Sequence, residues 1–133
     1  MRGLMLLGVI LALAGCKTGV VNADNPLEAG SHWSVVEIAG VPVPDGIAVT
    51  IDVPETGVIA GTSGCNRFNG RFEGTGESIR FGALAGTRMM CPPERMQVEQ
   101  AFHSHIGRVS RVSLSGDTLV MFEGETPVIR AHR

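Results

Sequence analysis

Several short segments between residue 31 and the C-terminus alternate apolar and polar residues. The clearest is 47–53, where Ile or Val at every second position is separated by Ala48, Thr50 and Asp52. Because successive side chains of a strand point to opposite faces, this alternation predicts a strand with one buried face. Shorter apolar or alternating runs next to turn residues predict further strands. These runs lie at 33–38, 58–61, 78–81, 111–115, 119–122 and 128–131.

One segment has the period of a helix instead. Pro92 and Pro93 suit a first turn, where their missing N–H groups cost nothing, and Glu94 complements the positive end of the helix dipole. The pattern predicts one amphipathic helix at about 93–109, packed on a curved antiparallel sheet, which is an α+β fold. The apolar stripe of this helix consists of Val98, Ala101, Phe102, His105, Ile106 and Val109.

The N-terminal segment has the features of a lipoprotein signal peptide. Arg2 precedes an apolar stretch at 4–13, which is far shorter than the ~20 residues that span a bilayer. The segment ends in Leu-Ala-Gly-Cys, which resembles the bacterial lipobox. We therefore expect residues 1–15 to be removed and Cys16 to be acylated, so that lipid anchors the protein to a membrane. Lys17 favours the outer membrane, with the protein on its periplasmic face.

The remainder of the chain suits one small domain. Residues 16–30 contain Gly, Asn, Asp and Pro without periodicity and are expected to form a flexible tether, so the domain covers 31–133. A net charge of −2 lacks the excess of Lys and Arg that nucleic-acid binding requires, and this class is excluded. Apolar residues make up 44% of the chain, too many for a disordered protein. We expect a monomer.

Two short motifs fall in predicted loops, Gly-Cys-Asn at 64–66 and Thr-Arg-Met-Met-Cys at 87–91. Taken in order, they resemble the META domain family, which includes the HslJ-like heat-shock-inducible lipoproteins of bacteria. The resemblance covers about residues 31–131. It implies a small antiparallel β-rich roll or incomplete barrel with one amphipathic helix packed against it. Further matching features are Trp33 in the leading strand, Glu99 and Phe102 in the helix, and Leu119 near the end.

Cys65 and Cys91 remain once Cys16 is acylated. In an oxidising compartment such a pair most often forms a disulfide, which is what we expect here. The alternative is a reactive thiol, because Cys91 lies just before a helix N-terminus, where thiolates are favoured. Metal binding is not expected, because His103 and His105 point to different sides of a helix.

The polar residues beside the two motifs are the candidates for binding. One interpretation is a structural clasp, because Asn bonds readily within its own loop. The other is that Arg67 and Arg88, which flank the two cysteines, form a small cationic site for an anionic partner. The candidate binding residues are Asn66, Arg67, Asn69 and Arg88.

Candidates for catalysis are few. Ser63 lies in a Gly-rich loop without the glycine placement of a nucleophile elbow and is interpreted as a turn residue. Glu94 and Glu99 are not a facing pair on the helix and are expected on its solvated edge. His105 lies on the apolar stripe and is expected to be buried and hydrogen-bonded. We therefore expect no catalytic residue, no metal and no cofactor.

Three classes of function follow from these observations. The first is a non-enzymatic envelope lipoprotein that supports stress tolerance or envelope integrity by binding a partner. The second is a pilot or chaperone-like lipoprotein for a secretion channel, because META domains are similar in fold to such pilots. The third is a thiol-based redox protein, which lacks any assembled site in the sequence.

Overall fold

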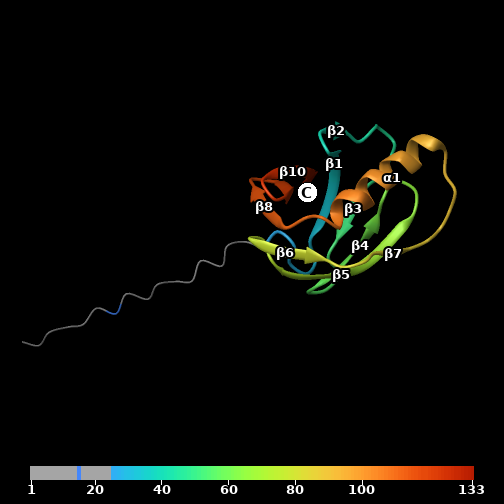
Figure 1. The fold of residues 1–133 in the computed structure, drawn as a ribbon. Coiled ribbons are helices and arrows are strands. Elements are labelled where there is room, and N and C mark those ends of the chain that lie inside the picture. The colour runs from blue at the N-terminus through green and yellow to red at the C-terminus, as the bar shows by residue number, and fades with distance from the viewer. Residues whose placement is uncertain (1–14, 16–24) are drawn as a thin grey trace, which may run out of the picture.

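The computed structural model describes residue 15 and residues 25–133 (Figure 1). The predicted signal peptide, apart from Gly15, and the predicted lipidation residue Cys16 lie outside these residues. The folded part consists of ten strands and one helix. In chain order these are β1 (His32–Ile38), β2 (Val41–Pro42), β3 (Thr50–Asp52), β4 (Val58–Thr62), β5 (Arg67–Thr75), β6 (Ser78–Phe81), β7 (Ala85–Gly86), α1 (Pro93–Ile106), β8 (Arg111–Ser115), β9 (Thr118–Glu123) and β10 (Thr126–His132).

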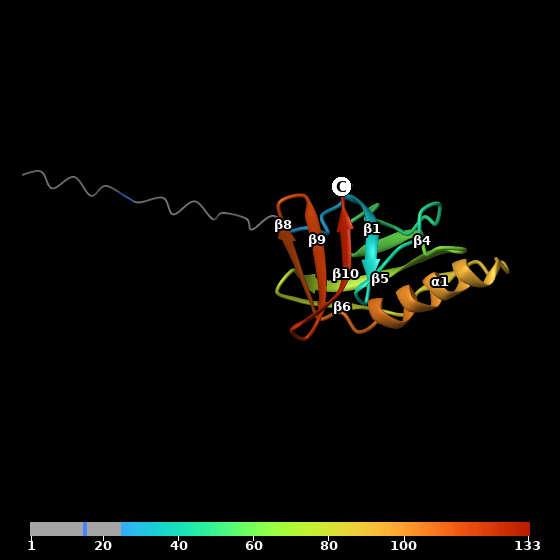
Figure 2. The same cartoon turned by 90° about the horizontal axis from the view of Figure 1, so that it is seen from above.

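The strands form a single antiparallel sheet that curls into an incomplete barrel. The order of the strands along the sheet is β6-β5-β4-β3-β1-β10-β9-β8. The two short strands outside this order pair with one strand each, β2 with β1 and β7 with β5. Figure 2 shows β8, β9, β10 and β1 side by side, with α1 along the edge of the roll. The strands at the two ends of this order, β6 and β8, lie close to each other. The N–H of Ile79 donates to the carbonyl oxygen of Ser110 at 3.1 Å, and the N–H of Val112 donates to that of Gly76 at 2.7 Å. The predicted α+β roll with one helix against it is confirmed.

The alternating strand residues and one face of α1 form the core. Phe102 and Ile106 of the helix are buried against the inner side of the sheet, and the ring centroid of Phe102 lies 5.1 Å from that of Phe68 in β5. Within residues 25–133, no helix is long and apolar enough to cross a membrane. The largest fully buried side chains include Trp33, Leu27, Ile51, Ile59, Leu119, Met121 and Ile129.

The folded unit begins earlier than the sequence predicted. Leu27 is only 1% exposed, although it falls in the expected flexible tether. The carbonyl oxygen of Pro26 accepts a hydrogen bond of 3.0 Å from the indole N–H of buried Trp33. Residues 25–30 are therefore part of the domain, because Leu27 fills the core and Pro26 satisfies a buried donor.

Other elements also differ from the predictions. The segment predicted as a strand at 47–53 contains only the short β3 at Thr50–Asp52. No strand was expected between residues 62 and 77, but β5 begins at Arg67 and runs for nine residues. The helix was expected to reach residue 109, but it ends at Ile106. Gly107 is its C-cap, and the N–H of Val109 bonds the carbonyl of Ile106 three residues back in a tight turn. Val109 stays buried, so the apolar stripe continues past the point at which the helix stops.

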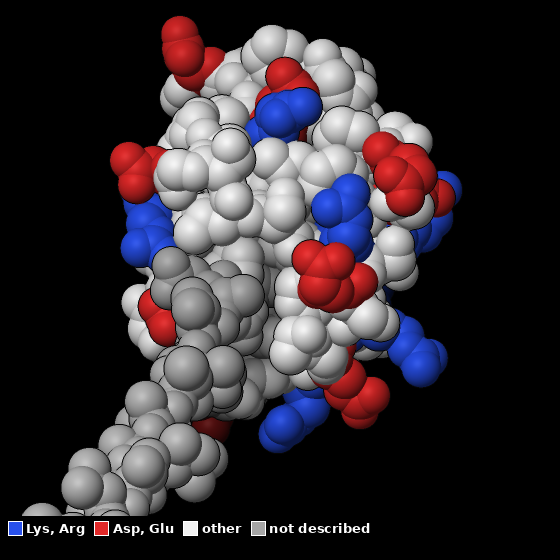
Figure 3. Space-filling view, turned by 90° about the vertical axis from the view of Figure 1, so that its left-hand side faces the viewer, with Lys and Arg blue, Asp and Glu red and all other residues white. Residues whose placement is uncertain are grey.

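The charged side chains are distributed over the surface. On the face shown in Figure 3, acidic and basic residues lie interspersed and form no large patch of one sign. Any recognition of a charged partner on this face must therefore depend on local groups rather than on a broad field.

Candidate functional site: two loops clasped to the helix

Two loops that are distant in the sequence are joined at one end of the sheet. The first loop (63–66) connects β4 to β5, and the second (87–92) connects β7 to α1. A disulfide links Cys65 of the first to Cys91 of the second, with Cα atoms 5.9 Å apart. Gly64 has a φ of +107°, and a Cβ there would lie 3.1 Å from a backbone carbonyl oxygen of α1. The first loop therefore lies directly against the helix.

Asn66 is the centre of the clasp between the loops. Its Oδ1 accepts from the backbone N–H of Met89 at 2.6 Å and from the hydroxyl of Thr87 at 3.0 Å. Its Nδ2 donates to the carbonyl of Met89 at 3.2 Å and to Oε2 of Glu99 at 2.8 Å. These contacts use both donors and both acceptor positions of the amide, and the residue is buried. The side chain is thus engaged within the protein and has little capacity left for a ligand.

The carboxylate of Glu99 in α1 holds the first loop against the helix through hydrogen bonds. Its Oε1 accepts from the backbone N–H of Asn66 at 2.7 Å and from the hydroxyl of Ser63 at 2.8 Å. Burial opposes ionisation and raises the pKa of Glu99, but the hydrogen bonds from Asn66 and Ser63, with the nearby His103 ring, outweigh it and hold the pKa below its usual value. The expectation that Glu99 is solvated was wrong, whereas Glu94 is exposed as expected.

Ser63 and His103 complete this polar cluster. The Ser63 hydroxyl is fully buried, and its Oγ lies 2.8 Å from Oε1 of Glu99 and 3.0 Å from Nε2 of His103. The hydroxyl oxygen also lies 3.1 Å from the carbonyl oxygen of Asn66. Carboxylate and carbonyl oxygens only accept hydrogen bonds, so the single hydroxyl hydrogen goes to these oxygens and the histidine donates to the hydroxyl oxygen. A histidine that donates cannot also take the serine proton. The geometry is therefore that of a structural network and differs from a nucleophile with its general base.

The two histidines of the helix contact different neighbours. The ring of His103 faces Ser63, while Nδ1 of half-buried His105 lies 3.3 Å from a guanidinium nitrogen of Arg108 and 4.0 Å from a carboxylate oxygen of Glu123. His105 was expected to be buried and hydrogen-bonded. It has polar neighbours, but it is only half-buried. Within residues 25–133, no group of three His, Cys, Asp or Glu side chains could hold a metal ion.

Arg67 and Arg88 lie beside the clasp on the solvent side. Both are exposed, and both line one hollow of about 310 Å³ together with Asn66 and His103. Among the described residues, neither arginine forms an ion pair. Asn69 lies elsewhere: it is exposed on β5, where its backbone pairs with β4 and β7, and it does not line the hollow. The structure thus brings three of the four predicted binding residues together.

The sequence profile of the META domain matches residues 25–133. The chain belongs to the META domain family. The match covers the described stretch 25–133, including the two loops, the helix and the strands described above. No curated protein matches the chain.

Two solved structures have the same fold as this META domain. One is an NMR structure of a protein from Burkholderia xenovorans, 22% identical, with a TM-score of 0.66 over 80% of this chain and 83% of that one. The other is an NMR structure of a protein 23% identical, with a TM-score of 0.61 over 77% of this chain and 89% of that one. At these identities the likeness concerns the fold alone.

The sequence contains one signal for the buried cluster that its apolar periodicity does not show. Glu99 precedes Phe102 by three positions, which places its side chain on the apolar side of the helix. A carboxylate in that position needs buried donors. Asn66 of the Gly-Cys-Asn motif supplies these donors, since both its backbone N–H and its side-chain amide donate to Glu99.

Proposed function

We propose that this META domain protein is a non-enzymatic envelope lipoprotein that supports stress tolerance or envelope integrity by binding an anionic partner. The observation that carries the proposal is the pair of exposed guanidinium groups, Arg67 and Arg88, beside a rigid clasp. Because a disulfide and the Asn66 hydrogen bonds fix both loops, the backbone positions of the two arginines are fixed before a ligand binds. Arginine suits carboxylate and phosphate groups through paired N–H donors.

Replacing both Arg67 and Arg88 with Ala should abolish most partner capture and leave the melting temperature nearly unchanged. Both side chains are exposed and unpaired among the described residues, so little folding energy depends on them. The measurement is crosslinking in living cells, followed by purification from solubilised envelopes and identification of the partner. The matched control replaces Arg71 and Arg80, which are exposed on β5 and β6.

Two results would count against the arginine site. A large fall in melting temperature for the double variant would show that the arginines are structural clasps. Equal loss of capture in the Arg71 and Arg80 control would show that general surface charge is responsible. Recovery of a secretion-channel subunit as the crosslinked partner would favour the pilot function over an envelope-integrity role.

The lipoprotein part of the proposal predicts that Cys16 carries the lipid. It is supported by the short apolar segment that ends in Leu-Ala-Gly-Cys. We expect the wild-type protein to sediment with outer membranes and to have an acylated mass, because several acyl chains together anchor a protein stably. A Cys16→Ala variant should lose both properties. If that variant stays with membranes after a salt wash and keeps the acylated mass, the anchor lies elsewhere.

A further inference from the structure

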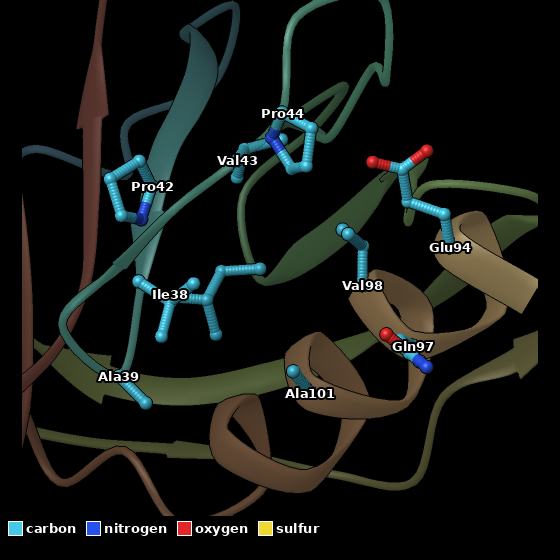
Figure 4. A pocket seen from close by; sticks show the side chains of 10 residues that line it. Ile38, Ala39, Pro42, Val43, Pro44, Glu94, Gln97, Val98 and Ala101 are labelled. Atoms are coloured by element: carbon cyan, nitrogen blue, oxygen red, sulfur yellow. The ribbon is translucent and has the colours of Figure 1, made fainter.

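A second concavity lies on the other side of the helix from the arginine site. It has a volume of about 310 Å³ and is formed between α1 and the hairpin of β1 and β2 with the segment that follows it (Figure 4). Glu94, Gln97, Val98 and Ala101 line it from the helix. Their spacing of i, i+3, i+4 and i+7 places them on one helix face, whereas Glu99 and His103 face the clasp. The groove is thus a separate surface.

Apart from the Gln97 amide and the Glu94 carboxylate, the side chains that line the groove are aliphatic. In Figure 4 the side chains of Ile38 and Val98 point toward one another across the groove, with Val43 and Pro44 above them. Val41 at the hairpin is 65% exposed, and Val43, Val98 and Ala101 are only partly buried. An open apolar surface of this kind favours the burial of an aliphatic chain from a ligand.

The hairpin offers this ligand almost no hydrogen-bond donors. Pro42 and Pro44 have no N–H, and prolines on an edge strand prevent a further strand from pairing there. The N–H of Ala39 already bonds Val128 O at 2.7 Å, and that of Val43 bonds Val36 O at 2.9 Å. A ligand with an anionic group would therefore find few partners on this wall.

One charged group lines the groove, and it is acidic. Glu94 is exposed at one end of the groove and forms no ion pair with the other described residues. The adjacent Arg95 does not neutralise it, because its guanidinium points to the carbonyl of Gly46, 3.4 Å away. The groove therefore combines an aliphatic wall with an unpaired carboxylate at its end.

We propose that this groove binds a lysine in an extended segment of a partner protein. Lysine matches both features, since its four-carbon stem lies along apolar surface while its ammonium stays at the rim. The stem packs between Ile38 and Val98, and the ammonium donates to the carboxylate of Glu94. The site is independent of the anionic partner proposed for Arg67 and Arg88.

The test uses the full-length protein and a fluorescein-labelled peptide, Gly-Val-Lys-Val-Gly, in a fluorescence anisotropy titration. Two matched peptides replace the lysine by norleucine, which keeps the stem without the charge, or by glutamate. We expect the lysine peptide to bind most tightly and the glutamate peptide most weakly. Glu94→Gln should weaken the lysine peptide about five- to tenfold and leave the norleucine peptide unchanged, because only one charged hydrogen bond is removed.

Two control variants isolate the groove. Glu125→Gln removes an exposed carboxylate from the turn between β9 and β10 and should bind the lysine peptide as the wild type does. The double Ala variant of Arg67 and Arg88 should also bind it normally, which separates this site from the arginine site. The proposal is wrong if the three peptides bind equally, if none binds at millimolar concentration, or if Glu94→Gln has no effect.

Discussion

Replacing Glu99 with Gln should lower the free energy of unfolding by about 1–3 kcal/mol, since this is the cost of a buried polar group that loses its partner. In the wild type, the two carboxylate oxygens accept three hydrogen bonds from Ser63 and Asn66. A glutamine amide retains one oxygen but turns an NH₂ group toward the Asn66 amide, so two donors face each other. Urea denaturation measures the change.

The matched control is Glu94→Gln, the same chemical change at an exposed position of the same helix. It should alter the free energy of unfolding by less than about 0.5 kcal/mol. If both variants lose equal stability, the effect belongs to the helix and its dipole. If neither does, the buried network contributes nothing measurable and the clasp depends on the disulfide alone.

The pH dependence of stability gives a second readout for Glu99. The pKa of this carboxyl is lower in the folded protein than its usual value of 4.5. The unfolded state therefore binds the proton more tightly, so the contribution of Glu99 is fully present above pH 4.5 and is lost as the pH falls through the folded-state pKa. The Gln variant should show a flatter dependence of unfolding free energy on pH in this acidic range.

Breaking the disulfide between Cys65 and Cys91 should cost about 3–4 kcal/mol, because the bond closes a long loop in the unfolded chain. The two cysteines are 26 positions apart. The native protein should have a mass two hydrogens lighter than the reduced protein and should resist iodoacetamide until it is reduced. Reduction should then lower the thermal midpoint appreciably. A Cys65→Ser, Cys91→Ser double variant should show the same loss without reductant.

The same labelling experiment decides the redox alternative. Rapid alkylation of Cys91 in protein extracted from cells without a reductant would show that the thiol is free in the cell, and would revive a thiol-based function. The two cysteine positions differ in access, because Cys65 is buried and Cys91 is only partly covered. Asn66 also bonds the two loops to each other, so the reduced domain should keep them close together at room temperature.

The sequence predicted best those elements whose side chains follow a simple period. The strands around Ile51 and Ile79 alternate cleanly, and the structure places strands there. β5 was missed because Gly70 and Gly74 interrupt its apolar alternation, although Phe68 and Phe72 both face the core. Other parts of the chain pack so closely against Gly70 and Gly74 that a side chain at either position would collide with them. The hydropathy pattern of the sequence does not show this.

The partner of Glu99 in the buried cluster could not be predicted, for a different reason. Glu99 and Asn66 are 33 positions apart, and nothing local to either shows that one accepts the donors of the other. A glutamate on a helix is solvated in most proteins. Its burial here depends on the first loop approaching α1, which is possible because Gly64 has no side chain.

If Cys16 carries a lipid, the packing of residues 25–30 into the domain limits the distance between the domain and the membrane. With Pro26 and Leu27 packed into the domain, only nine peptide steps separate Cys16 from residue 25. Fully extended, they span at most ~30 Å. A lipid on Cys16 would therefore confine the domain to a shallow layer next to the bilayer. A partner must itself lie in that layer or extend into it, and components that stay deeper in the periplasm are out of range.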